Sequence, residues 1–171
     1  MDDFELARNG DSEAFKILVE TVKIKLYKTG MAILKNDDDT CDAIQETLLS
    51  AYKNLNSLKD PKYFSTWIIR ILINKCYDII EKNKKVVAIN QKMEVENTGY
   101  YQFYASESIL ENVLNRIDTD LRTVTVLYYY DELSISEIAE SLNIPEGTVK
   151  SRLSRARNTV FEILKQKEGE F

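Results

Sequence analysis

The segment from Ser134 to Arg157, SISEIAESLNIPEGTVKSRLSRAR, constrains the fold more than any other part of the chain. Ser134 and Glu137 have the spacing of a capping box, which starts a helix by satisfying free backbone N–H groups. Apolar residues follow at helical spacing, Asn143 suits a helix end, and the next proline suits the start of a new helix. The segment therefore predicts a helix, a tight turn and a second helix that starts near residues 145–148, which is the layout of a helix-turn-helix that reads DNA.

The second helix of this segment is expected to have an apolar side and a basic side. On a helical wheel at about 100° per residue, one stripe holds Val149, Leu153, Ala156 and Val160. The opposite side holds Ser151, Ser154, Arg155 and Asn158, with Lys150 at its edge. Base contacts are therefore expected from Lys150, Ser151 and Arg155. Arg152 and Arg157 flank the apolar stripe, so they are expected to hold phosphates or to pair with acidic residues of the same domain. A helical hairpin whose basic face is merely solvated is the alternative.

The composition favours a helical protein without a membrane span. Of the 171 residues, 44% are hydrophobic, which is enough for the cores of one or two domains, and five glycines and two prolines are few for a protein of sheets and turns. The chain has no apolar run long enough for a membrane helix, and its acidic first residues lack the apolar stretch of a signal peptide. Cys41 and Cys76 are expected to be buried free thiols in a reducing cytosol, so we predict a cytoplasmic protein.

The residue types give little support for enzyme activity. The chain has no histidine, which removes the most common general base and the most common metal ligand. It also has no P-loop, no G-x-S-x-G and no H-E-x-x-H pattern. We therefore expect no catalytic residue, no metal, no cofactor and no small-molecule substrate.

The net charge of −5 hides two basic regions in an acidic protein. Residues 61–92 have a net charge of +5 and residues 147–171 have +3, whereas residues 1–60 have −4 and residues 93–146 have −9. Basic regions attract phosphates, and acidic surroundings weaken non-specific binding to DNA. This distribution predicts that the chain alone binds DNA weakly and that a larger partner provides most of the affinity for DNA.

The whole chain is expected to be all-α, with two small helical domains joined by a flexible linker. Helical periodicity covers about Asp11–Lys35, Asp39–Leu55 and Lys62–Lys84, with Asp39 or Thr40 as the expected cap of the second stretch. Residues 56–61 have the composition of a loop, and residues 86–106 lose helical periodicity. Helices resume near Glu107 and again from about Leu121 to Tyr130. The expected domains are a helical bundle at 1–85 and the helix-turn-helix domain at 107–171, with the linker at 86–106.

The helix that starts at Phe64 carries a second notable pattern. Its apolar side holds Ile68, Ile69, Leu72, Ile73, Cys76, Ile79 and Ile80. Its other side holds Trp67, Arg70, Asn74 and Asp78, with Lys75 at the margin. A tryptophan beside an arginine and an asparagine can stack on an unpaired base, and nearby lysines can follow the backbone of the same strand. Packing of Trp67 against the preceding loop is an equally good interpretation of the same pattern.

Four segments together resemble the bacterial RNA polymerase sigma factors of the extracytoplasmic-function (ECF) subfamily of the sigma-70 family. DAIQETLLSAYKNL resembles the polymerase-binding helix of the family's first domain, and FSTWIIRILINKCYD resembles the helix that opens the minus-ten element. IDTDLRTVTVLYYYDELSISEIAESL resembles the start of the second domain, and IPEGTVKSRLSRAR resembles the reader of the minus-thirty-five element. The resemblance implies that residues 1–85 are sigma region 2 and that residues 107–171 are sigma region 4.

The resemblance also implies roles for individual residues. The clamp helices of the polymerase β′ subunit would be bound by Asp42, Gln45 and Glu46. The minus-ten DNA would be contacted by Leu58, Lys62, Phe64, Trp67, Arg70, Asn74 and Lys75. Within this set, the loop from Leu58 to Phe64 would hold a flipped base with Asn74 behind it, and Arg70 and Lys75 would contact phosphates. The minus-thirty-five duplex would be contacted by Thr148, Lys150, Ser151 and Arg155.

The implied function is that of an alternative sigma factor, which binds the β and β′ subunits of core RNA polymerase and directs transcription from specific promoter DNA. The resemblance also implies a response to cell-envelope or extracellular stress and an anti-sigma factor, anchored in the membrane, that restrains the chain. Two alternatives are a conventional helix-turn-helix regulator that binds duplex DNA as a dimer, and an interaction adaptor with a vestigial DNA helix. The Trp67 face and the helix with Gln45 and Glu46 favour the sigma factor, because a repressor needs neither.

Overall fold

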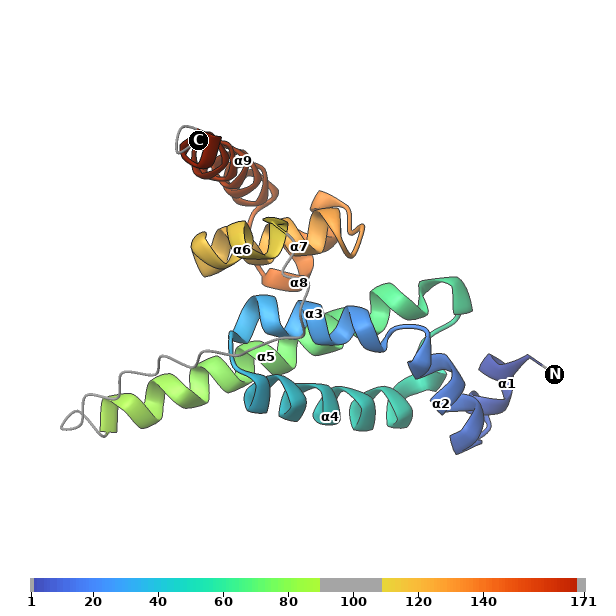
Figure 1. Ribbon diagram of the computed structural model, residues 1–171. Coiled ribbons are helices and arrows are strands. Elements are labelled where there is room, and N and C mark those ends of the chain that lie inside the picture. The colour runs from blue at the N-terminus through green and yellow to red at the C-terminus, as the bar shows by residue number, and fades with distance from the viewer. Residues whose placement is uncertain (1, 90–108, 169–171) are drawn as a thin grey trace. The chain divides into compact units, whose positions relative to one another are not determined.

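The computed structural model describes residues 2–89 and 109–168, and all regular secondary structure in these two ranges is helical (Figure 1). The predicted all-α class is therefore confirmed. Contacts between Cα atoms divide the chain into a first unit within Met1–Glu96 and a second unit within Asn97–Phe171.

The first unit is a helical bundle. Its α-helices are α1 (Asp3–Arg8), α2 (Ser12–Glu20), α3 (Lys23–Leu34), α4 (Asp37–Asn54) and α5 (Phe64–Ile89). Two 3₁₀ turns, η1 (Leu55–Ser57) and η2 (Pro61–Tyr63), lie in the connection from α4 to α5, part of which was predicted as a loop. Helices α3, α4 and α5 pack against one another, and α1 packs against α2 (Figure 1). The short helix α1 was not predicted.

Helix α5 supplies the centre of the hydrophobic core of the first unit. The predicted apolar stripe is confirmed, because its first five members, Ile68, Ile69, Leu72, Ile73 and Cys76, are buried. Ile79 and Ile80 are half-buried. Full burial of a leucine or isoleucine side chain stabilises a fold by roughly 1.5–3 kcal/mol, so this stripe is a main source of the unit's stability. Helix α5 continues to Ile89, three residues past the position at which the linker was predicted to begin, and residues 90–106 of that linker lie outside the described residues.

The single helix predicted over Asp11–Lys35 is two helices, and the break has a local cause. The amides of Thr21 and Val22 bond to carbonyls three residues back, at 3.2 and 3.0 Å, and Thr21 Oγ1 donates to the Leu18 carbonyl at 2.6 Å. Val22 then leaves the helical region, with φ −120° and ψ −6°, and its side chain is buried. A hydroxyl that competes for backbone carbonyls and a β-branched neighbour both favour such a break.

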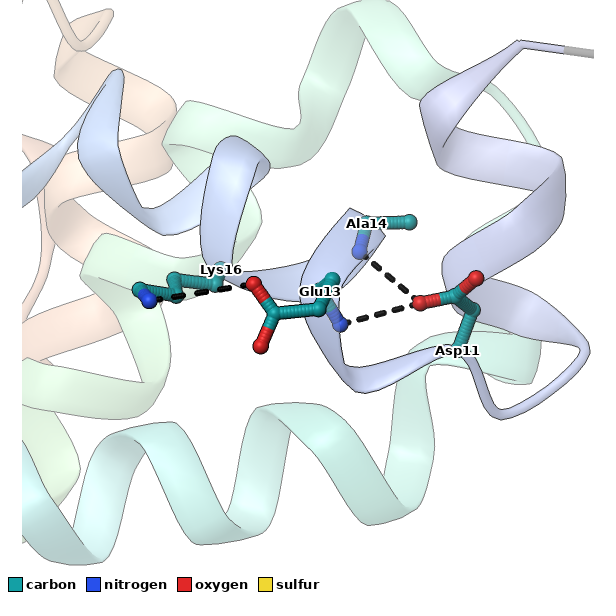
Figure 2. A network of polar contacts seen from close by, with 4 residues as sticks. All are labelled: Asp11, Glu13, Ala14 and Lys16. Carbon is teal, nitrogen blue, oxygen red and sulfur yellow. Dashed lines mark hydrogen bonds and ion pairs between the residues drawn. The ribbon is translucent and has the colours of Figure 1, made fainter.

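Asp11 begins α2 as predicted (Figure 2). Its Oδ1 accepts hydrogen bonds from the backbone N–H groups of Glu13, at 2.9 Å, and Ala14, at 3.1 Å. These bonds satisfy two of the donors that a helix start leaves free. Lys16 and Glu13 form an exposed ion pair in the same turn, with 3.7 Å between Nζ and Oε2, and such a pair contributes little stability.

Helix α4 starts earlier than predicted, because Asn36 and not Asp39 or Thr40 is its cap. The Asn36 side chain accepts a hydrogen bond from the backbone N–H of Asp39 at 2.8 Å. The first turn then carries the three carboxylates of residues 37–39, which the helix dipole favours at this end. Thr40 is fully buried instead. Lys35 ends the preceding helix in the left-handed region, with φ 54°.

The second unit contains α6 (Ile109–Arg116), α7 (Thr119–Tyr129), α8 (Ile135–Leu142) and α9 (Glu146–Glu168). Helix α9 packs against each of the other three helices (Figure 1). The apolar stripe of α9 is buried and lies at the centre of the hydrophobic core of this unit. That core also includes Val113, Ile117, Val124, Leu127 and Ile138. Helices α6 and α7 begin close to the predicted positions, within the usual spread of helix boundaries.

Arg122 is a buried cation that joins α6 to α7. Its guanidinium donates hydrogen bonds to the carbonyl of Ile117 at 3.4 Å and to Oγ1 of Thr119 at 3.2 Å. Burial lowers the pKa of Arg122 to about 10, while the carboxylate of Asp118 acts in the opposite direction. The side chain therefore stays charged at neutral pH. It donates a hydrogen bond to the Ile117 carbonyl, just after the end of α6, which the helix itself leaves without a partner.

The two cysteines are free thiols as predicted, but only Cys76 is buried. Burial raises the pKa of the Cys76 thiol to about 12, which keeps it protonated and unreactive. Cys41 is exposed, which corrects the prediction that both thiols would be buried. The reason is its place on α4, whose buried side is formed by Thr40, Ala43 and Thr47.

Gly30 is expected to be required for the close approach of α3 and α4. A Cβ atom at Gly30 would lie 2.7 Å from Cγ2 of the buried Thr40, which must then move. Overpacking of this kind costs about 1–3 kcal/mol, and the better helix propensity of alanine offsets about 1 kcal/mol of it. Gly30→Ala should therefore lower the free energy of unfolding by up to about 2 kcal/mol, measured by urea titration with the fluorescence of Trp67, the only tryptophan of the chain.

A double-mutant cycle checks the cause of this loss. Thr40→Ser removes Cγ2 but keeps the hydroxyl that donates to the sulfur of Met31 at 3.5 Å. In the Thr40→Ser background, Gly30→Ala should be neutral or stabilising by up to about 1 kcal/mol. An equal loss of stability in both backgrounds would contradict the steric explanation.

Candidate nucleic-acid interface

Helices α8 and α9 form the predicted helix-turn-helix, and α8 has the predicted cap at each of its ends. The Ser134 hydroxyl accepts a hydrogen bond from the Glu137 N–H at 3.2 Å, and Glu137 Oε2 accepts one from the Ser134 N–H at 2.9 Å. Asn143 ends α8 in the left-handed region, with φ 51° and ψ 46°. The Pro145 carbonyl accepts the first hydrogen bonds of α9, from Thr148 and from the following valine. The local chemistry of this segment thus produces the predicted turn.

The two sides of α9 are as predicted. The buried side consists of Val149, Leu153 and Ala156, while Val160 is half-buried. The exposed side consists of Lys150, Ser151, Ser154, Arg155, Arg157 and Asn158. Thr148, another predicted DNA contact, is half-buried at the start of the helix. A row of cationic and hydroxyl side chains therefore faces outward from a helix that the rest of the unit holds rigid.

Ion pairs within the second unit separate the cations of α9 into two kinds. Arg152 donates to the carboxylate of Asp120 on α7, so it is engaged inside its own domain, one of the two roles predicted for it. Lys150 lies 3.8 Å from the carboxylate of Glu146 one turn earlier, and both side chains are more than half exposed. An exposed pair of this kind is weak, so a phosphate can replace Glu146. Ser151 Oγ donates to the Thr148 carbonyl at 3.0 Å, which leaves its oxygen as an acceptor.

The polar side of α5 is also partly exposed. Asn74 and Asp78 are exposed, and Trp67, Arg70 and Lys75 are half-buried. The Trp67 ring lies against the ring of Phe64, with 6.2 Å between centroids and 38° between planes. This contact supports the interpretation of Trp67 as a packing residue.

The connection before α5 places the predicted site residues in two different environments. Leu58 and Phe64 are 7% and 6% exposed, so their side chains belong to the hydrophobic core. Lys62 is exposed, and its Nζ lies 2.9 Å from Oδ2 of Asp60 and 4.7 Å from the ring centroid of Tyr63. Tyr63 is 52% exposed and was not among the predicted residues. Its position beside a lysine in the connection before a basic helix was the available sequence signal.

Helix α4 presents a separate acidic face. Asp42, Gln45 and Glu46 are exposed, as a surface for a partner requires. Helical spacing places Leu49 among them, and this leucine is 56% exposed, although the sequence prediction did not include it. Glu46 lies 3.9 Å from Lys75 of α5, so the acidic face of α4 adjoins the polar side of α5.

The described residues contain neither a metal site nor a membrane span. Within residues 2–89 and 109–168, no cluster of acidic, cysteine or histidine side chains has a geometry suited to a metal ion. Over the same residues, no helix combines the length and the apolar character that crossing a membrane requires.

Both units match known protein families. Residues 18–86 match the model of sigma-70 region 2, and residues 107–160 match the model of sigma-70 region 4. The chain is 34% identical over 174 residues to the ECF RNA polymerase sigma factor SigW of Bacillus subtilis, with 92% of each chain covered. It is 29% identical to the ECF RNA polymerase sigma-E factor of Escherichia coli K12, over 91% of this chain and 89% of that protein.

Two solved structures share the fold. The sigma factor RpoE of Bartonella quintana, in complex with the anti-sigma factor NepR, matches with a TM-score of 0.73 and 26% identity, over 88% of this chain and 96% of that chain. CnrH, in complex with the cytosolic domain of CnrY, matches with a TM-score of 0.63 and 24% identity, over 96% of both chains. At that identity, the likeness to CnrH concerns the fold alone.

Proposed function

The chain belongs to the ECF sigma factors of the sigma-70 family, which direct transcription, and we propose that its first unit docks core RNA polymerase and holds opened minus-ten DNA while its second unit reads duplex minus-thirty-five DNA. The observation that carries this division is the pair of basic surfaces on separate units. One lies on α5 and its preceding connection, and the other lies on α9. The family matches assign the corresponding residues to regions 2 and 4.

In the second unit, we assign base reading to Lys150, Ser151 and Arg155 of α9. These side chains share the exposed side of a helix whose other side is locked in the hydrophobic core. Arg155 can donate two hydrogen bonds to a guanine, and Ser151 can accept one because its own proton is engaged by the Thr148 carbonyl. Thr148 is proposed to lie near the backbone, and Arg157 to hold a phosphate.

Arg155→Ala is expected to weaken discrimination at one base position more than it weakens general binding. The loss should be about 1–3 kcal/mol for the preferred base and much less for the other three, because a bidentate contact is specific to guanine. Arg157→Ala is the matched control, since it should weaken binding to all sequences and reduce the salt slope by about 1. Affinities of the holoenzyme for duplexes with each single-base change measure both effects. A uniform loss for Arg155→Ala would instead assign this side chain to a phosphate.

In the first unit, we assign opened minus-ten DNA to the side chains at and after the connection before α5. We propose that Lys62, Arg70 and Lys75 contact phosphates and that Asn74 contacts a base. Lys62 and Asn74 are exposed, and Arg70 and Lys75 are half-buried. Leu58 and Phe64 are proposed to hold the connection in position from the hydrophobic core, where their side chains are buried. Trp67 is proposed to fix the start of α5 through its contact with Phe64.

We propose that the acidic face of α4 binds the clamp helices of the polymerase β′ subunit and that the second unit contacts the β subunit. Asp42, Gln45 and Glu46 are exposed on this face, and Leu49 adds an apolar anchor within an acidic rim. An apolar contact surrounded by polar residues is the usual composition of a binding hot spot.

Regulation by an anti-sigma factor is part of the proposal. The structure of Bartonella quintana RpoE, which this chain resembles at 26% identity, was solved with the anti-sigma factor NepR. We propose that a membrane-anchored anti-sigma factor restrains this chain in the cytoplasm and releases it under envelope or extracellular stress. A single-pass membrane protein with a cytosolic helical domain, encoded by the neighbouring gene, would support this assignment.

Transcription in vitro with purified core polymerase tests the proposed function. The chain should give promoter-dependent transcripts, and permanganate should modify thymines of the opened promoter only when both the chain and polymerase are present. A conventional helix-turn-helix regulator would bind the duplex as a dimer and give no opening. An adaptor with a vestigial DNA helix would tolerate Lys150→Ala with Arg155→Ala.

A further inference from the structure

Arg152 is a cation of α9 that is tied to another helix. Its guanidinium donates a hydrogen bond to the carboxylate of Asp120, which lies in the first turn of α7. The Arg152 side chain is only 19% exposed and that of Asp120 is 55% exposed, whereas Lys150 and Arg155 are exposed on the outward side of α9. The ion pair therefore holds one arginine of α9 against α7, apart from the cations that face outward.

The place of Arg152 on α9 would bring it to DNA phosphates if Asp120 did not hold it. Helical spacing puts Arg152 one turn after Thr148, on the edge of α9 that we propose to lie near the DNA backbone. An arginine on this edge contacts phosphates, which carry no sequence information. The carboxylate of Asp120 neutralises the charge of Arg152 and repels a phosphate that approaches it. The ion pair thus opposes a contact that would strengthen binding to any sequence.

We propose that Asp120 is a positioning residue that sets the DNA specificity of the second unit by keeping Arg152 away from phosphates. The inference rests on the proposed function and adds a residue that lies outside the helix-turn-helix. On an unrelated duplex, no base contact fixes the register of α9, so the helix can shift until a phosphate meets a released guanidinium. On the preferred duplex, Arg155 fixes that register. Release of Arg152 therefore strengthens binding to unrelated DNA more than binding to preferred DNA.

Salt titrations of the full chain on two duplexes test this role. One duplex carries the minus-thirty-five element of a promoter that the transcription experiment identifies, and the other has an unrelated sequence. Asp120→Asn should bind the unrelated duplex roughly 3- to 10-fold more tightly at about 0.1 M salt, and its slope of log K against log salt should be steeper by about 1, because one more phosphate contact forms. Its preference for the minus-thirty-five duplex should fall. Asp120→Glu, which keeps the carboxylate, should behave as wild type.

Two controls separate the release of Arg152 from a general change of charge. Asp118→Asn removes the same charge from the same end of α7, but the carboxylate of Asp118 acts on Arg122, which is buried. This variant frees no exposed cation, so it should bind the unrelated duplex within about twofold of wild type. In an Arg152→Gln background, Asp120→Asn should no longer change the salt slope, because the cation that it releases is absent.

Three results would overturn the proposed role of Asp120. These are unchanged or weaker binding of Asp120→Asn to the unrelated duplex, an equal gain on both duplexes, and a gain that persists in the Arg152→Gln background. Thermal melting of Asp120→Asn should stay close to that of wild type, because a partly exposed ion pair contributes little stability. The unrelated duplex needs neither a promoter nor polymerase. Failure of the proposed function would therefore be visible separately, as a lack of promoter-dependent transcripts from the wild-type chain.

Discussion

A chain that carries Asp42→Lys together with Glu46→Lys is expected to lose its affinity for core polymerase and keep its fold. Both side chains are exposed on α4, so their replacement disturbs no buried contact. If the acidic face meets a basic partner, the reversal places like charges together, which costs several kcal/mol. We expect a loss of about 4 kcal/mol, roughly a thousandfold in Kd, measured by titrating labelled chain with core polymerase.

The matched control carries the same change of charge on another helix of the first unit. Glu13→Lys with Glu20→Lys reverses two exposed carboxylates of α2, where each pairs with a lysine three residues later (Figure 2 shows the pair of Glu13). This variant should bind polymerase within a few-fold of wild type. If both double variants lost affinity equally, net charge and not the face of α4 would govern docking, and the proposed interface would be wrong.

Leu72→Ala is expected to remove much of the stability of the first unit. Leu72 is fully buried on α5, the helix that packs against both α3 and α4. Truncation of a buried leucine costs about 2–5 kcal/mol, and a domain has only about 5–15 kcal/mol in total. Trp67 fluorescence during urea unfolding reports on this unit because Trp67 is the only tryptophan.

The two units should respond differently to this change. Leu72→Ala should abolish polymerase-dependent opening under mildly denaturing conditions, while binding of the second unit to duplex DNA should survive. Leu72→Met, which conserves volume, should cost less than about 1.5 kcal/mol. A cost below 1 kcal/mol for Leu72→Ala would contradict the central place of α5 in the hydrophobic core.

The helix-turn-helix was predictable because its determinants are local. The capping box of Ser134 and Glu137, the left-handed Asn143 and the apolar stripe of α9 act within a few residues of one another, and the structure confirms each of them. The same holds for Asp11 and for the apolar stripe of α5, since periodicity reports burial directly.

The features that the sequence did not predict are those that depend on tertiary contacts or on competing local hydrogen bonds. The sequence pattern could not show that Thr40 would be buried against α3 and leave the cap of α4 to Asn36. It also could not separate Leu58 and Phe64, which face the hydrophobic core, from Tyr63, which faces solvent, because a connection of this length has no regular period. The exposure of Leu49 was not predicted, because an apolar residue on a helix is by default expected to be buried.

Selection of transcribed promoters from a random DNA library, with purified core polymerase and this chain, tests most directly whether the two units read two separate elements. Transcripts should start downstream of two conserved sequence blocks. Arg155→Ala should relax the upstream block alone, and Asn74→Ala should weaken opening at the downstream block alone. Transcripts that depend on one block only, or a library from which this chain selects nothing while a known sigma factor succeeds, would contradict the account.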